Sequence, residues 1–282
     1  MRLITALITP FINDNEICPS IDYESTSKIL KEQFDSGVRD ILVMGSTGEG
    51  SALLFSERKE FLSFVINKSR EYEKQNKVNL NVIACVNANV TSIAIEQAKD
   101  AKTCGANQIM ITSPCYNKPT EIGLYKHFSF IASQIDLPII LYNVPSRTSI
   151  NIPIHMIKQL FDENSNIIGI KDATSDISRI HEILFLFREK VFAGDDESIL
   201  TFGFEGAGGI ISVISNLLIR EMLQICSAIQ EHDTKKAIDE YRKIYKIISN
   251  TSKITNPIGI KTEMSKKYSY IKNCMRLPLC AD

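Results

Sequence analysis

Short apolar runs alternate with longer amphipathic stretches along most of the chain. Runs rich in isoleucine, valine and leucine predict eight buried strands, at residues 3–10, 40–45, 81–86, 108–114, 138–144, 167–173, 191–195 and 208–215. Stretches with apolar positions at helical spacing lie between these runs, and the clearest predict helices over residues 22–37, 56–74, 90–105 and 120–135. A repeated strand–helix order of this kind is typical of parallel β/α folds.

The number of strands decides between two such folds. Eight strand–helix units within roughly 215 residues fit a closed (β/α)8 barrel better than an open doubly wound sheet, which has fewer strands and a dinucleotide-binding glycine motif. From about Asn216 onward the pattern is wholly helical, through 216–233, 233–250 and a segment after Pro257. We therefore predict an α/β TIM barrel with the active site over residues 1–224, followed by a C-terminal helical region over residues 225–282.

The composition excludes several classes of protein. Of the 282 residues, 44% are hydrophobic and 23% are charged, which describes a chain able to bury a large core. Because 32 lysines and arginines are balanced by 33 acidic residues, no excess of positive charge is available to bind nucleic acid or an anionic membrane. The chain has no apolar run of roughly 18 residues and its start turns acidic before a signal-peptide core is complete. We expect a cytoplasmic protein without nucleic-acid or membrane partners.

Cysteine and histidine placement argues against metal chemistry. The seven scattered cysteines form no CxxC motif and have no histidine at metal-ligand spacing, so we expect reduced thiols and no metal site. The histidines lie on polar or helical segments, and we expect all four at the surface: His127, His155, His181 and His232. A Ser-His-Asp mechanism lacks suitably placed residues.

In a barrel of this type, the active site forms at the carboxyl ends of the strands. Lys171 ends the sixth apolar run, where partial desolvation would favour the neutral amine that attacks a carbonyl to form an imine. A lysine that reaches out to solvent or pairs with Asp172 is an equally open interpretation.

The fifth run ends in LYNVPSRT, which places Tyr142 at the mouth and Arg147 in the following loop. A phenol beside an amine can transfer protons, and a guanidinium can bind a carboxylate through two hydrogen bonds. An isolated tyrosine or arginine is more often a core residue or a solvated charge. Their proximity to Lys171 favours the functional interpretation.

Two glycine-rich segments are candidate anion sites. GSTGEG, residues 45–50, could bind a carboxylate through backbone amides and the hydroxyls of Ser46 and Thr47, or could be a tight turn whose hydroxyl caps a helix. Glycines expected after the seventh and eighth strands leave a phosphate-binding barrel as a competing interpretation: Gly194, Gly206, Gly208 and Gly209.

Several of these segments occur together in one protein family. GSTGEG, SPCYNKPT, ILYNVPSRT, IIGIKDAT, AGDD, GGIISV and NPIGIK have the order and spacing seen in dihydrodipicolinate synthases. The chain resembles this family over nearly its whole length, within the pyruvate-dependent class I aldolases that also include N-acetylneuraminate lyase. The arginine of YNVPSRT favours the synthases, because the sialic acid lyases typically have an aliphatic residue there.

The resemblance implies roles for particular residues. Lys171 would form the Schiff base with pyruvate, and protons would pass between Tyr142, Ser46 and a neighbouring subunit's copy of Tyr116. Ser46 replaces the threonine usual in the synthases, and GSTGE is also common in the lyases. The remaining matches are to substrate-binding positions: Thr47 for the pyruvate carboxylate, Ile211 for a backbone contact to the keto acid, Arg147 for the aldehyde substrate, and Gly194 beside them.

The activity implied is condensation of pyruvate with L-aspartate 4-semialdehyde to 4-hydroxy-tetrahydrodipicolinate, the first committed step of diaminopimelate and lysine biosynthesis. The family needs no metal or organic cofactor and forms homo-oligomers, either dimers or homotetramers built as dimers of dimers. Two alternatives stay open. One is a pyruvate aldolase or lyase of the N-acetylneuraminate lyase type that uses a different aldehyde. The other is a catalytically silent barrel that binds a keto acid.

The resemblance also bears on regulation and on the end of the chain. Asn89 matches a position that lines the L-lysine cleft of feedback-inhibited members, but Ile93 replaces their glutamate and Cys115 replaces an aromatic residue. Phe55 and Arg58 stand where histidine or glutamate is common, so we predict insensitivity to L-lysine. MRLPLCAD resembles the family's penultimate segment, so we expect the customary last helix to be absent.

Overall fold

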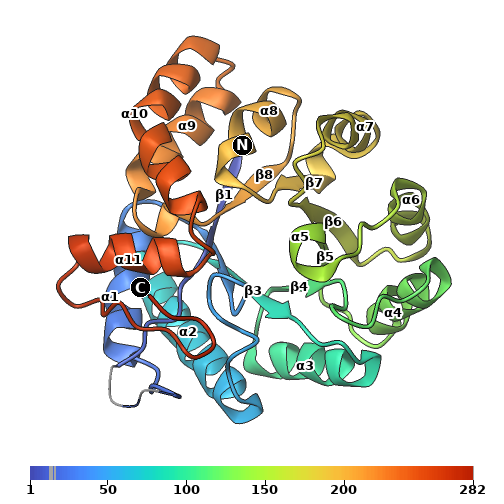
Figure 1. Ribbon diagram of the computed structural model, residues 1–282, viewed down its shortest axis with the longest axis horizontal. Helices are drawn as coiled ribbons and strands as arrows, with labels where there is room; N and C mark the ends of the chain where they lie inside the picture. Colours follow the sequence, from blue (N-terminus) through green and yellow to red (C-terminus); the bar gives the residue numbers. More distant parts are fainter. Residues whose placement is uncertain (13–14, 16, 282) are drawn as a thin grey trace.

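The computed structural model describes residues 1–12, 15 and 17–281. Within this part of the chain, eight parallel strands close into a barrel in sequence order, with β8 hydrogen-bonded to β1 (Figure 1). The strands are β1 (Arg2–Ala6), β2 (Asp40–Val43), β3 (Asn81–Val86), β4 (Gln108–Thr112), β5 (Ile139–Asn143), β6 (Ile167–Asp172), β7 (Val191–Ala193) and β8 (Gly209–Ser212). The predicted TIM barrel is therefore confirmed.

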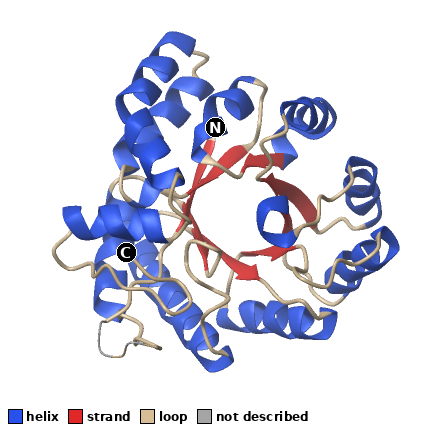
Figure 2. Ribbon diagram, in the orientation of Figure 1, coloured by secondary structure: helices blue, strands red, loops and turns tan. Residues whose placement is uncertain are grey.

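Helices surround the ring of strands, and the short α5 lies over its opening in this view (Figure 2). The barrel helices are α1 (Tyr23–Asp35), α2 (Phe55–Asn76), α3 (Thr91–Cys104), α4 (Glu121–Ser133), α5 (Pro145–Thr148), α6 (Ile154–Glu163), α7 (Ile177–Phe187), α8 (Ile199–Phe204) and α9 (Ile219–Gln230). Polar side chains cap several starts, as where Asp22 accepts a hydrogen bond from the backbone N–H of Ser25 at 2.9 Å.

The chain ends in an added helical layer of α10 (Thr234–Ser252) and α11 (Ile258–Lys267), as the pattern predicts. In Figure 1, α10 packs beside α9, and α11 contacts α10. The expected boundary between residues 224 and 225 falls inside α9. Residues 268–281 contain no helix.

Alternation along the strands divides the core into two layers. Side chains such as Ile83, Ile140 and Phe192 fill the inside of the barrel, while Ile109 and Leu141 face the surrounding helices. No helix in the described part of the chain has the length and apolar character needed to cross a membrane.

One histidine departs from the sequence expectation. His127 is buried on α4 with its Nδ1 3.0 Å from Oγ1 of Thr91, whereas His155, His181 and His232 are exposed. Burial lowers the pKa of His127 to about 4. The surface prediction was wrong for His127 because this residue lies on the same helical face as the buried Leu124, Phe128 and Ile131, and helical position outweighs polarity there.

Candidate active site

A cavity of about 960 Å³ opens at the carboxyl ends of the strands. Its walls come from the loops after β2, β5, β6 and β7 and from the connection between α10 and α11. It brings together most of the residues singled out from the sequence: Lys171, Tyr142, Ser46, Thr47, Arg147 and Gly194. This is where barrel enzymes place their chemistry.

The inner part of the cavity is formed by a lysine and a tyrosine on adjacent strands. Lys171 of β6 pairs in register with Tyr142 of β5, so both side chains lie at the same level of the barrel. Each is only 5% exposed, and Nζ of Lys171 lies 4.4 Å from the centroid of the Tyr142 ring. An amine and a phenol are thus held together, mostly away from water, at one end of an open cavity.

The carboxylate next to Lys171 in sequence is engaged elsewhere. Asp172 pairs with Arg179 at 3.0 Å and accepts hydrogen bonds from the Asn143 amide and the Thr174 hydroxyl. Successive side chains on a strand point to opposite faces, so Asp172 faces the helices while Lys171 faces the cavity. The alternative in which Lys171 pairs with Asp172 was therefore wrong.

The loop of residues 45–50 is fixed by close backbone packing. A Cβ on Gly50 would lie 1.8 Å from the carbonyl oxygen of Met44, so no larger residue fits there. Oγ1 of Thr9 donates a 2.6 Å hydrogen bond to the Gly48 carbonyl. Because α2 begins only at Phe55, the alternative in which a loop hydroxyl caps a helix was wrong.

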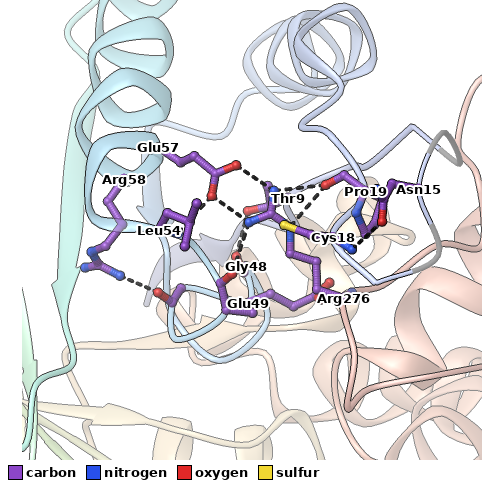
Figure 3. Close-up of polar contacts among 12 residues, drawn as sticks. Thr9, Asn15, Cys18, Pro19, Gly48, Glu49, Leu54, Glu57, Arg58 and Arg276 are labelled. Atoms are coloured by element: carbon purple, nitrogen blue, oxygen red, sulfur yellow. Dashed lines mark hydrogen bonds and ion pairs between the residues drawn. The ribbon is translucent and has the colours of Figure 1, made fainter.

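Glu49 joins this loop to the C-terminal region. Its carboxylate is fully buried, forms an ion pair with Nζ of Lys261 on α11, and accepts a 3.1 Å hydrogen bond from the backbone N–H of Arg276. Figure 3 shows Arg276 between Glu57 of α2 and the carbonyl of Pro19. Burial lowers the pKa of the Lys261 ammonium, and Glu49 opposes that shift. These contacts hold the 45–50 loop against the chain's last described segment.

We predict that Lys261→Met lowers the free energy of unfolding by about 3–5 kcal/mol, because it leaves the Glu49 carboxylate buried without its cation. Urea unfolding measures this change. The matched control is Lys266→Met on the same helix, which removes a solvent-exposed pair with Glu263 and should cost below about 1 kcal/mol. Equal effects of the two variants would contradict the prediction.

Two charged groups, Arg147 and Asp195, line the outer part of the cavity. Arg147 of α5 is exposed, and its Nη2 donates a 2.9 Å hydrogen bond to the carbonyl of Asn256. Solvent reaches Asp195, yet the surrounding protein raises the pKa of its carboxyl, and the positive charges of Lys171 and Arg147 oppose that rise. Arg147 is thus the cation available to a substrate carboxylate near the mouth.

Gly194 fits its place for a steric reason. A Cβ there would lie 2.5 Å from the Ala173 side chain and 2.7 Å from the Asp172 carbonyl oxygen, so glycine lets β6 and β7 end close together.

Two predicted residues do not line the cavity. Ile211 is fully buried inside the barrel, and Tyr116 is 91% exposed, with a left-handed backbone (φ 68°) that aromatic residues rarely adopt.

For three of its four glycines, the competing phosphate site is contradicted by the topology. Gly206, Gly208 and Gly209 precede or begin β8, so they lie at the opposite end of the barrel from the cavity. A Cβ on Gly208 would lie 2.0 Å from the Glu189 carbonyl oxygen, which explains the glycine by packing. The sequence interpretation placed this loop after the last strand, whereas it comes before it.

The class of protein follows from this arrangement. A mostly buried lysine beside a tyrosine, at the carboxyl end of a (β/α)8 barrel and next to a hydroxyl-bearing loop, defines a lysine-dependent aldolase of class I. Comparison with known proteins identifies the family. The Dihydrodipicolinate synthetase family matches residues 1–281, and the chain belongs to it.

Individual relatives agree with this assignment. The 4-hydroxy-tetrahydrodipicolinate synthase of Hydrogenobaculum sp. (strain Y04AAS1) is 36% identical over 278 residues, covering 98% of this chain and 91% of the relative. The crystal structure of dihydrodipicolinate synthase from Aquifex aeolicus superimposes with a TM-score of 0.92 at 34% identity, covering 100% of this chain and 92% of that one. The chloride-inhibited enzyme of Acinetobacter baumannii complexed with pyruvate gives a TM-score of 0.91 at 33% identity, covering 99% and 92%. The predicted family, fold and enzyme class, a lyase of the class I aldolase type, are confirmed.

Proposed function

We propose that this enzyme condenses pyruvate with L-aspartate 4-semialdehyde through a Schiff base on Lys171. The observation that carries the proposal is the pairing of Lys171 with Tyr142 at the inner part of the cavity, with Thr47 and Arg147 in its walls. This set supplies a nucleophilic amine, a group for proton transfer and separate partners for two carboxylates.

The first half of the reaction forms a carbon nucleophile. The Lys171 amine adds to the ketone carbon of pyruvate, and loss of water from the carbinolamine gives an imine. Tyr142 is placed to return and remove protons in these steps. Thr47 binds the pyruvate carboxylate. Loss of a methyl proton then converts the imine into an enamine, whose terminal carbon is nucleophilic.

The second half forms the carbon–carbon bond and releases the lysine. The enamine carbon attacks the aldehyde carbon of aspartate semialdehyde, whose carboxylate is held by Arg147, and the aldehyde oxygen becomes the 4-hydroxyl group. The amine of the former aldehyde substrate then adds to the imine carbon and displaces Lys171. The product is 4-hydroxy-tetrahydrodipicolinate, and one water is released overall.

A coupled assay tests the substrate assignment directly. Purified enzyme is supplied with pyruvate and either aspartate semialdehyde or N-acetylmannosamine, and consumption of pyruvate is followed. We expect turnover with aspartate semialdehyde alone. Turnover only with the sugar would favour a lyase of the N-acetylneuraminate type, and pyruvate binding without turnover would favour a silent keto-acid-binding barrel.

The cytoplasmic location expected from the sequence stays a prediction.

Exposed apolar residues support a homo-oligomer. The starts of the neighbouring helices α2 and α3 expose Leu54, Phe55, Val90 and Ile93, between 43% and 61% each. Tyr116 precedes α4, the next helix around the barrel, and the Asn89 side chain accepts a hydrogen bond from the backbone N–H of Cys115 beside it. A surface of this kind favours pairing with a second copy, in which Tyr116 reaches the partner's cavity.

We predict that mixing inactive Tyr116→Phe and Lys171→Ala enzymes restores activity. A mixed dimer has one cavity with both native residues, so random exchange should recover about a quarter of wild-type activity. Activity after subunit exchange measures this. The control mixes Lys171→Ala with the doubly substituted chain, which cannot form a complete site. Exchange without recovered activity would contradict the shared site.

The residues that match the L-lysine cleft of feedback-inhibited family members also lie in this region. Arg58 is buried there, donating hydrogen bonds to the carbonyl oxygens of Gly50 and Cys85. The Asn89 side chain is already engaged by the 113–120 loop, and Ile93 offers no carboxylate. A ligand ammonium entering this region would meet a positive charge and find no anionic partner among these residues.

We therefore predict that millimolar L-lysine does not inhibit the enzyme. Loss of a carboxylate partner for a buried ammonium costs on the order of 3–5 kcal/mol, a hundredfold or more in affinity. A dose-response curve to 10 mM, matched with potassium chloride for ionic strength, provides the measurement. Strong inhibition below about 1 mM, near −4 kcal/mol of binding, would overturn it.

A further inference from the structure

Asn256 lies in the cavity wall between the two proposed carboxylate partners. It belongs to the connection between α10 and α11, outside the strand ends that usually supply barrel active sites. Its side-chain Nδ2 donates a 2.9 Å hydrogen bond to Oγ1 of Thr47. Its main-chain carbonyl accepts the 2.9 Å hydrogen bond from Nη2 of Arg147. One residue therefore contacts both groups, through its side chain on one side and its backbone on the other.

The direction of the hydrogen bond to Thr47 matters for binding. A threonine hydroxyl carries a single donor hydrogen and can also accept. Because the Asn256 amide donates to Oγ1, the Thr47 hydroxyl keeps its hydrogen for another acceptor, and a carboxylate in the cavity is such an acceptor. If the neighbouring group were instead an acceptor, the Thr47 hydroxyl would donate its only hydrogen to that group. It could then no longer donate a hydrogen bond to the substrate carboxylate.

Both ends of this contact are rigidly supported. Thr47 is buried, and two residues further on Glu49 is paired with Lys261. Lys261 is in turn five residues after Asn256, on α11. The loop and the α10–α11 connection are thus joined a second time just behind the Asn256–Thr47 contact, so little flexibility remains to misalign it.

We propose that Asn256 is a positioning residue that directs the Thr47 hydroxyl donor towards the keto acid and holds Arg147 at the outer part of the cavity. The proposal rests on the proposed function, because it assumes that Thr47 binds the pyruvate carboxylate. It predicts an asymmetry between the substrates. A side-chain change at Asn256 affects pyruvate first, since the contact to Arg147 uses the main chain and survives the change.

The test replaces Asn256 by aspartate, which has nearly the same shape but only accepts hydrogen bonds from Thr47. Imine trapping with borohydride is measured against pyruvate concentration, together with KM for both substrates. We expect the half-saturating pyruvate concentration to rise about 10- to 100-fold, and the aldehyde KM to rise less. Asn256→Ala removes the hydrogen-bond donor without adding a charge. This variant should also raise the half-saturating pyruvate concentration.

Two controls separate this role from added charge and from misfolding. Asn151→Asp adds the same charge to the cavity wall, but this residue accepts a hydrogen bond from Asn143 and has no contact with Thr47, so half-saturation should change less than 3-fold. In a Thr47→Val background, Asn256→Asp should have little further effect.

One contrary result is that the wild type traps the imine normally while both Asn256 variants keep its half-saturating pyruvate concentration. That result would overturn the role of Asn256 but leave the proposed function standing. An equal rise in the Asn151 variant would also overturn it. Absence of any trapped imine in the wild type would overturn the proposed function and this inference with it.

Discussion

Lys171→Ala is expected to lower kcat by more than about 10⁴-fold while leaving the fold intact, because the variant loses the amine that carries the covalent intermediate. Stability should be almost unaffected. Lys171 forms no ion pair with a carboxylate in the described chain, and Asp195, which feels its charge, is reached by solvent and also feels the charge of Arg147, so removing Lys171 leaves no buried carboxylate without a cation. Steady-state rates and thermal unfolding provide the two measurements.

Lys190→Ala is the matched control. Lys190 also lies over an aromatic ring, 4.6 Å from the centroid of Phe161, but outside the cavity. Its removal should change kcat less than about 2-fold, since it touches no reacting group. Lys171→Ala with more than a tenth of wild-type activity would mean that the chemistry uses another group.

Tyr142→Phe is expected to lower kcat by about 10²–10⁴-fold, the usual contribution of a positioned acid–base group. The ring that lies beside Nζ of Lys171 is retained, so the lysine keeps its surroundings. A proton-transfer group speeds the approach to equilibrium without altering it. The amount of imine trapped after long incubation with pyruvate should therefore match the wild type, while its rate of formation falls.

The surface Tyr125→Phe variant is the control, because the Tyr125 hydroxyl contacts Glu163 on the outside of the barrel. It should change neither rate nor trapping. If Tyr142→Phe kept wild-type kcat, another group would have to move the protons. If it lost imine at equilibrium as well, Tyr142 would be needed for pyruvate binding rather than for proton transfer.

The fold and the inner part of the site could be predicted because both depend on local pattern. Buried parallel strands give continuous apolar runs, and the rule that strand ends meet at one rim places Lys171 beside Tyr142. The same rule failed for the glycines at 206–209, because their loop was assigned to the wrong end of β8. His127 was misplaced because polarity alone does not show which helical face is buried.

Arg147 in the outer part of the site was predicted, but the Asn256 connection that contacts it could not be predicted in this way. Asn256 lies 209 residues from Thr47 and 109 from Arg147, and no periodicity relates a connection in the added helical layer to a barrel loop. Glu49 and Lys261 lie in the GSTGEG and NPIGIK segments, but they are 212 residues apart and nothing in either segment shows that the two side chains pair. Only the three-dimensional packing of the C-terminal helices against the barrel brings these groups together.

In the proposed reaction, pyruvate becomes covalently attached to Lys171. Borohydride reduction in the presence of pyruvate, followed by intact-mass measurement and peptide mapping, tests it most directly. We expect one reduced keto-acid fragment per chain, located at Lys171 and absent from Lys171→Ala. A wild-type chain without the adduct, or an adduct that persists in Lys171→Ala, would contradict it.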